Sequence, residues 1–314
     1  MAAGPACSDL ARPDALKDLF LPSLCTVAPK ALVLAPLLPA AMNLTTLYNT
    51  AAAYPKTDLM PVLFVGHGSP MNGLEDNAFT RSLHQLRARL TPPKAIVVVS
   101  AHWQTRGTFV TNNQRPETIH DFGGFPQELF DMRYPAPGAP DLAQAIVEHV
   151  EHVHGAADWG LDHGTWTILH HLYPQADIPV VQLSLDYTKP LAWHFEFARQ
   201  LQFLRERGVL IIGSGNVVHN LRLSMPKLMA GDATPYEWAT QFDDWVKAKL
   251  DQRDLAGLIN YQQAGPSGAL AVPSLDHYLP LLYTAGLARP AETITHTFEE
   301  VTFGGLSMRT FQVG

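Results

Sequence analysis

Residues 61–70 read PVLFVGHGSP, an apolar run that ends in a glycine-rich turn around His67. This pattern predicts a buried strand over residues 61–65 followed by a tight loop. Residues 95–100, AIVVVS, form a second apolar run and lead directly into His102. Continuous runs rich in β-branched residues are typical of strands that are buried on both faces of a parallel sheet.

Strands and helices are expected to alternate along the rest of the chain. Apolar residues at helical spacing predict helices over residues 79–90, 190–208 and 236–250, and Asp141 with Gln144 predicts a capping box for another helix. Further strands are predicted over residues 179–185, 209–212, 293–298 and 309–313. We therefore predict an α/β fold from residue 60 to 314, a single domain with a central, mostly parallel sheet and helices on both faces.

Composition narrows the class of protein. Of the 314 residues, 46% are hydrophobic and 16% are charged, so the chain can bury a large core. The net charge of −7 and the lack of a basic run argue against binding to nucleic acid or to an anionic membrane. Cys7 and Cys25 are the only cysteines, which excludes a disulfide framework and a thiolate metal site in the body of the protein. The 14 histidines leave imidazole and carboxylate for metal or proton chemistry.

The first 59 residues differ from the rest of the chain. They are rich in Ala, Pro and Leu and show no sustained period of a strand or a helix. We expect a disordered leader, or a translation start assigned too early with Met42 or Met60 as the true start; a targeting segment is the alternative. Asp9 and Asp14 occupy the place of the basic region of a secretory signal, so we expect a cytoplasmic protein.

Three histidines follow predicted strands directly: His67, His102 and His219, the last just after the Gly213–Gly215 turn. Ligands of open α/β sheets bind at the carboxyl ends of the strands, so these side chains should converge. Each histidine alone is more often a structural residue, but together they favour a metal site. Imidazoles without thiolates suit Zn, Fe, Cu or Ni.

Other histidines and other chemistries are less clear. His163 and His277 each follow an aspartate in polar, turn-like surroundings, and we expect no Asp–His pair because adjacent side chains rarely bond each other. The sequence has no dinucleotide fingerprint, phosphate loop or Gly-x-Ser-x-Gly elbow. Ser69 precedes Pro70 and therefore does not suit a nucleophile turn.

Six motifs together resemble a known family. They are GHGSPM (66–71), SAHW (100–103), IHDFGGFP (119–126), DHGTW (162–166), GSGNVVHN (213–220) and HYLPLL (277–282). In this order they are similar to the motifs of the class III extradiol ring-cleavage dioxygenases, the LigB-type superfamily, and most of all to its 4,5-DOPA extradiol dioxygenase branch. The resemblance runs from about residue 60 to 314, and residues 1–41 have no counterpart.

The resemblance implies one non-haem metal ion held by His67, His102, His219 and His277. The wider superfamily uses two histidines and a carboxylate, and His277 takes the place of that carboxylate here. The identity of the metal is therefore open: Zn²⁺ suits four imidazoles, whereas ring cleavage requires Fe²⁺. His219 is left open as well, between a ligand and an acid–base group.

The implied reaction is extradiol cleavage of a catechol, similar to DOPA, by O₂. His163 is the expected acid–base group, and the alternative is that it holds its loop through hydrogen bonds. His120, Asp121 and the Phe122–Phe125 loop are expected to border the substrate. Two other functions remain open: a Memo-type interaction or redox protein without this catalysis, and a zinc hydrolase. The sequence does not indicate an oligomeric state.

Overall fold

The computed structural model describes residues 54–314, and the predicted leader lies outside this range except for its last six residues. The main sheet of the described part has the strand order β4-β3-β5-β2-β6-β1-β10-β7. These strands are β1 (Val62–Gly66), β2 (Ala95–Thr105), β3 (Thr108–Thr111), β4 (Val153–Ala156), β5 (Val180–Asp186), β6 (Val209–Gly215), β7 (Ile294–Phe298) and β10 (Thr310–Val313). A small hairpin of β8 (Val301–Thr302) and β9 (Leu306–Ser307) lies outside the sheet.

The centre of the sheet is parallel. Strand β6 pairs in parallel with both β1 and β2, and β2 pairs in parallel with β5. Strand β10 joins β1 and β7 in antiparallel pairing, and β3 joins β5 in the same way. The predicted mostly parallel sheet is confirmed, and it places the carboxyl ends of β1, β2 and β6 side by side at one edge.

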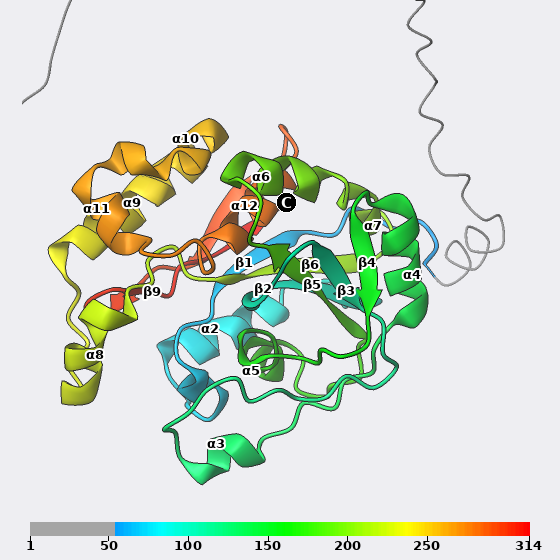
Figure 1. Cartoon of the computed structure of the whole chain (residues 1–314), viewed down its shortest axis with the longest axis horizontal. Coiled ribbons are helices and arrows are strands. Elements are labelled where there is room, and N and C mark those ends of the chain that lie inside the picture. Colours follow the sequence, from blue (N-terminus) through cyan, green and yellow to red (C-terminus); the bar gives the residue numbers. More distant parts are fainter. Residues whose placement is uncertain (1–53) are drawn as a thin grey trace, which may run out of the picture. The chain divides into compact units, whose positions relative to one another are not determined.

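Helices cover both faces of the sheet, as predicted (Figure 1). The helices are η1 (Pro70–Gly73), α2 (Ala78–Arg87), α3 (Gln127–Asp131), α4 (Pro140–His149), α5 (His163–Leu172), α6 (Leu191–Arg199), α7 (Gln202–Arg205), α8 (Leu221–Ala230), α9 (Glu237–Asp251), α10 (Leu255–Ile259), η2 (Tyr261–Ala264), α11 (Pro266–Ala271) and α12 (Leu279–Gly286). Among residues 54–314, no helix is both long and apolar enough to cross a membrane.

Strand β2 separates two hydrophobic core layers. Val97 and Val99 belong to the layer that contains residues of α6, α9 and α12. Ile96 and Val98 point to the opposite face and belong to the layer of α2 and α5. All four side chains are fully buried, which explains why this strand has no polar positions over its first half.

Two expectations about the helices differ from the structure. Asp141 does not cap α4: the helix begins at Pro140, its N-cap is Ala139, and no side chain caps it. Proline at the first helical position has its φ angle preset for a helix and lacks one of the N–H groups that a cap would satisfy. Asp141 therefore lies inside the first turn, where its charge favours the helix dipole. The helix predicted over residues 190–208 divides into α6 and α7.

The segment 54–59 already contacts the body of the protein. Tyr54 is only 8% exposed, and its backbone carbonyl oxygen accepts a hydrogen bond from Arg207 Nη1 at 2.9 Å. The Thr57 N–H donates to the Glu206 carbonyl at 2.8 Å. The domain boundary between residues 59 and 60 stays a prediction, and these contacts show that residues 54 and 57 pack against the body of the protein.

A chain that begins at Met42 should therefore be more stable than one that begins at Met60. The shorter chain loses the buried Tyr54 ring, and burial of a large apolar side chain contributes about 2 kcal/mol. Both chains should bind metal, since the histidines lie after Met60. Urea unfolding measures the difference, and equal unfolding free energies would show that residues 54–59 do not stabilise the fold.

Candidate metal centre

His67 is the first residue after β1 and is buried within the protein. The turn after it needs glycine, because Gly68 has a φ angle of +63° and a side chain there would overlap the sulfur of Met308. The His67 N–H donates to the Gly215 carbonyl of β6 at 3.1 Å. The predicted strand-to-loop transition thus places this imidazole at the carboxyl edge of the sheet.

The hydrogen bonds of His67 determine its tautomer. Its Nδ1 lies 3.0 Å from Ser214 Oγ, and the Ser214 hydroxyl donates its single proton to the Gly164 carbonyl. Ser214 must therefore accept from His67, so Nδ1 carries the proton and Nε2 presents a lone pair.

His102 has the complementary arrangement. It lies in the second half of β2, where a bulge interrupts the pairing with β5 between Val99 and Gln104. Its Nδ1 lies 3.2 Å from Asp121 Oδ2, and this carboxylate favours a proton on Nδ1. The lone pair of Nε2 then points away from Asp121 and toward His67.

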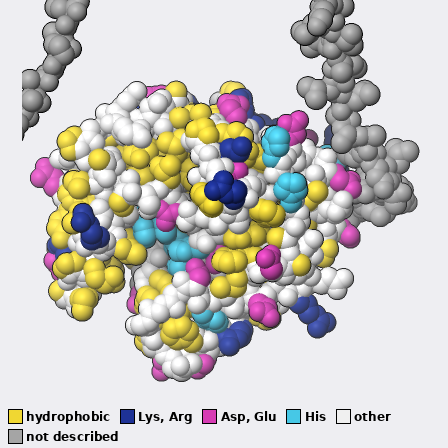
Figure 2. Space-filling model, in the orientation of Figure 1, with side chains coloured by type: hydrophobic (Ala, Val, Ile, Leu, Met, Phe, Trp, Pro, Cys, Tyr) yellow, Lys and Arg dark blue, Asp and Glu magenta, His cyan; other side chains and the backbone are white. Residues whose placement is uncertain are grey.

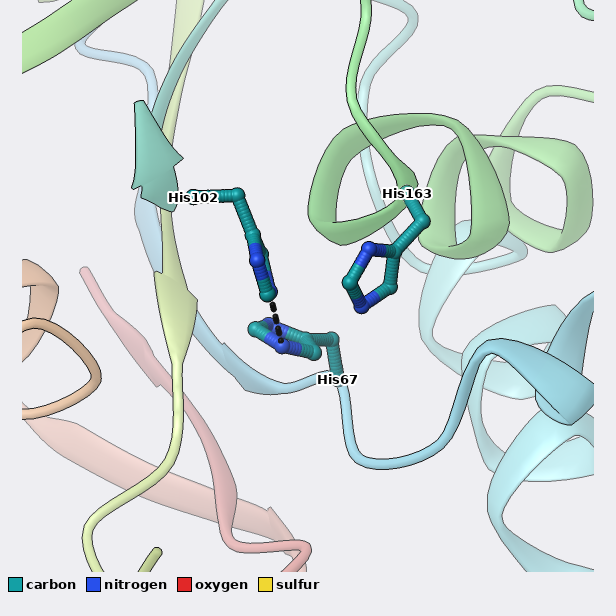
Figure 3. A group of neighbouring side chains, drawn as sticks. All are labelled: His67, His102 and His163. Carbon is teal, nitrogen blue, oxygen red and sulfur yellow. Dashed lines mark hydrogen bonds between the residues drawn. The ribbon is translucent and has the colours of Figure 1, made fainter. Parts of the chain in front are cut away.

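The two Nε2 atoms of His67 and His102 lie 3.0 Å apart (Figure 3). With both protons held on the Nδ1 atoms, two lone pairs face each other, which is unfavourable unless a cation lies between them. His163 faces the same point, and one nitrogen of each of these three rings lies within 4.8 Å of the others. The donor set therefore fits a divalent metal ion with imidazole ligands.

His163 is the first residue of helix α5, and the expectation of turn-like surroundings was wrong. Asp162 caps this helix by accepting a hydrogen bond from the Thr165 N–H. Gly164 lets the helix approach β2, because a side chain there would lie 2.8 Å from Ser100 Oγ and 2.9 Å from a carbon of His102. The aspartate before His163 therefore sets the start of the helix and does not pair with the imidazole.

Asp121 holds two of the histidines. Its Oδ2 lies 3.0 Å from His163 Nδ1 and 3.2 Å from His102 Nδ1, and its Oδ1 accepts from the His163 backbone N–H at 2.9 Å. Burial alone would raise the pKa of Asp121, but its contacts with His163 outweigh burial and lower the pKa. The carboxylate stays ionised and orients both rings, a role that the sequence did not indicate.

His219 and His277 lie against this group. Their rings stack on each other with centroids 3.5 Å apart, and the His277 ring lies 5.2 Å from that of His67 and 5.0 Å from that of His102. The structure therefore gathers five histidines, four of them the predicted metal ligands and the fifth His163. Their individual roles are taken up below as a proposal.

The expectation that no aspartate pairs with the histidine after it was wrong at His277. Its Nδ1 lies 2.8 Å from Asp276 Oδ2. Burial alone would raise the pKa of Asp276, but its contacts with His277, Ser274 and His219 together outweigh burial and lower the pKa. An adjacent pair forms here because both residues precede α12 in an irregular segment, where the backbone lets the two side chains turn toward each other.

Burial lowers the pKa of His67, His102 and His219 well below 6.5, and positive charge on neighbouring histidines would lower it further. These three imidazoles are therefore neutral at physiological pH. Neutral imidazole is the form that binds a metal ion.

His120 lies outside the group of five histidines. Its Nε2 is 3.1 Å from the Met132 carbonyl, and its ring packs against Trp166 and Phe122. Phe122 in turn packs against His163 with ring centroids 5.6 Å apart. The predicted substrate loop is thus close to the histidines through Phe122.

The comparisons with known proteins agree with this site. Residues 61–310 match the family model described as the catalytic LigB subunit of aromatic ring-opening dioxygenase. The chain belongs to this family.

Curated relatives carry a more specific name. The 4,5-DOPA dioxygenase extradiol of Escherichia coli K12 is 51% identical over 264 residues, which cover 81% of this chain and 95% of the relative. The enzyme of the same name from Beta vulgaris is 35% identical and covers 74% of this chain and 88% of its own length. A crystal structure of an uncharacterised E. coli K12 protein matches with a TM-score of 0.71 and 48% identity, over 81% of this chain and all of that one.

The protein is therefore an extradiol aromatic ring-opening dioxygenase that acts on a small molecule and O₂. Dioxygenases of this family use a metal, and the histidine group described above can hold one. Ser69, which the sequence argument set aside as a nucleophile, caps η1 by accepting a hydrogen bond from the Met71 N–H.

Replacing His102 with Ala should remove most of the bound metal, because it deletes one of the two facing nitrogens. His154→Ala, which changes an exposed histidine on β4, is the matched control and should retain the metal. Elemental analysis of the purified proteins measures this. A His102→Ala protein with one full equivalent of metal would contradict the assignment.

The metal should also stay bound as the pH falls through 6.5. Protons compete with a metal only near the pKa of its ligands, and burial lowers the pKa of His67, His102 and His219 below that value. In metal-free protein the same shifts should reduce stability below pH 6.5, because unfolded histidines then take up protons that the folded ones do not. Metal content and unfolding free energy measured from pH 8 to pH 5 test both statements. Loss of half the metal by pH 6.5, or a metal-free protein whose stability does not fall below pH 6.5, would contradict these statements.

Proposed function

We propose that the protein cleaves the ring of a DOPA-like catechol with Fe²⁺ bound to His67, His102, His219 and His277, and with His163 as the acid–base group. The observation that carries the proposal is the pair of Nε2 atoms that face each other at 3.0 Å. The names of the relatives, which specify DOPA, support the choice of substrate. Zn²⁺ suits the same imidazoles, but oxygen chemistry requires a redox-active ion.

When bound, the metal would supply the redox chemistry with O₂ and would lower the pKa of a catechol hydroxyl. The protein supplies the proton transfer. His163 lies beside the metal-binding nitrogens, and its Nδ1 faces the ionised Asp121. Because Nδ1 faces this carboxylate, Nε2 is the nitrogen of His163 that can take the second catechol proton and return it to the leaving oxygen.

Aromatic side chains are expected to enclose the substrate. Phe122 packs against His163, and Phe125 packs against Phe122 with ring centroids 5.3 Å apart. Such a border excludes water and holds the catechol ring in place. Direct contact of His120 or Asp121 with the substrate stays a prediction, as does the cytoplasmic location.

Replacing His163 with Ala should separate proton transfer from metal binding. If His163 transfers a proton, the variant keeps its metal and still binds a catechol, and turnover falls by about 10²–10⁴, the usual contribution of such a group. Metal content, melting temperature and oxygen uptake measured on one preparation of Fe²⁺-loaded protein test this. Loss of metal along with activity would make His163 a ligand, and unchanged turnover with full metal would remove it from the mechanism.

The same assay also tests the two functions that the sequence left open, both of which membership of the dioxygenase family argues against. An interaction protein of the Memo type consumes no O₂ with any catechol, even when it is loaded with Fe²⁺. A zinc hydrolase is active with Zn²⁺ and does not need O₂. Oxygen uptake that depends on both Fe²⁺ and catechol is expected only for catechol cleavage, and for neither the Memo-type protein nor the zinc hydrolase.

A further inference from the structure

A cleft of about 500 Å³ lies between the η1–α2 segment on one side and α8 with the β8–β9 hairpin on the other. We call it the side cleft. Its border is largely apolar and includes Met71, Phe79, Phe125, Phe303 and Met308. Figure 2 shows this face of the protein hollowed near a group of histidine side chains.

One wall of the side cleft is joined to His67 by a chain of hydrogen bonds. Asn72 Nδ2 donates to the His67 carbonyl at 2.9 Å. Asn77 Nδ2 in turn donates to Asn72 Oδ1 at 2.9 Å and to Glu75 Oε2 at 3.0 Å. Glu75 is therefore held at a fixed place relative to the metal-binding loop.

The opposite wall also reaches that loop. The Met308 N–H donates to the Glu300 carbonyl at 2.8 Å, and the Met308 sulfur fills the space where a side chain of Gly68 would lie. Phe125 borders the side cleft on a third side. Its ring packs against Phe122, which in turn packs against His163. Ser69 and Asn72 border the side cleft and belong to the loop that follows His67, so the cleft adjoins this loop, and the five histidines themselves lie outside its border.

The charge of the side cleft is negative. Glu75 and Glu300 border it, and no Lys, Arg or His of the described residues does. Within residues 54–314, neither carboxylate forms an ion pair, whereas the neighbouring Glu299 contacts Lys247 and Arg309. An ammonium group in the side cleft would be attracted by both carboxylates, and a carboxylate would be repelled.

We propose that the side cleft binds the ring substituent of the substrate and selects a catechol whose tail carries an ammonium group over one whose tail carries only a carboxylate. The proposal rests on the proposed catechol cleavage, because it assumes that the ring lies at the histidine group. The apolar border accommodates the carbon chain of the tail, and Glu75 and Glu300 attract its charged end.

Two phenols that cannot be ring-opened test the binding step. Tyramine carries an ethylammonium tail and phloretate a propionate tail on the same ring. On the metal-loaded protein at pH 7, tyramine should bind about tenfold more tightly, since each exposed ion pair contributes up to about fivefold. Isothermal titration measures both affinities, and 0.5 M salt should reduce their ratio because it screens exposed charges.

Variants assign the preference to the side cleft. Glu75→Gln and Glu300→Gln should each lower the affinity ratio severalfold, and the double variant should bring it close to one. Glu237→Gln, which removes an exposed carboxylate on α9 outside the side cleft, should leave the ratio unchanged. Melting temperatures show whether each variant is folded. Equal binding of the two phenols, or an unchanged ratio in the folded double variant, would overturn the proposal.

Turnover distinguishes failure of this inference from failure of the proposed function. Dopamine and dihydrocaffeate are catechols with ammonium and carboxylate tails, and kcat/KM should be about tenfold higher for dopamine. If the Fe²⁺-loaded protein opens neither ring, the proposed function fails, and the side cleft as a substrate subsite fails with it. If it opens both with equal kcat/KM, ring cleavage stands and only the selection of the tail is wrong.

Discussion

The site depends on the two imidazoles of His67 and His102, whose unprotonated nitrogens are held face to face. Ser214 and Asp121 fix this arrangement by contacting the Nδ1 atom of each ring. The sheet order makes it possible, because β6 lies between β1 and β2 and carries Ser214 next to His67. A change in this strand order would separate the rings, so the metal site and the core packing require the same topology.

Helix α5 brings the third imidazole, and its position requires a buried acid. Asp162 caps the helix while Ser100 and Gln182 each donate a hydrogen bond to its carboxylate at 2.7 Å. Burial, together with the negative charge of Asp121, raises the pKa of Asp162 to about 6. Two carboxylates with different pKa shifts therefore lie close to the histidines. Asp121 is ionised beside the rings, and Asp162 is buried beneath the start of α5 with a raised pKa. This difference follows from their contacts, since Asp121 contacts imidazoles and Asp162 contacts neutral donors.

The surroundings of the histidines divide into two kinds of surface. An aromatic side formed by Phe122 and Phe125 adjoins His163, while the side cleft beyond His67 carries two unpaired carboxylates. The first can enclose an aromatic ring, and the second distinguishes what the ring carries. Phe125 borders both surfaces, whereas the histidines that hold the metal and the carboxylates of Glu75 and Glu300 are separate residues.

The sequence by itself determined the strands and the histidines that follow them. Apolar runs such as residues 95–100 mark buried parallel strands through local composition alone, and the parallel arrangement places His67 and His102 at one edge. The order of six short motifs was enough to indicate the family.

What the sequence could not determine depends on contacts between distant segments. Ser214 and Gly164 meet across 50 positions, and Asp121 reaches His163 across 42. The start of α5 at His163 has a local signal in the capping Asp162, whereas the Asp276–His277 pair depends on backbone direction, which neighbouring residue types do not specify. Only the tertiary structure decided which nitrogens carry protons, because tautomers follow from the partners that folding brings together.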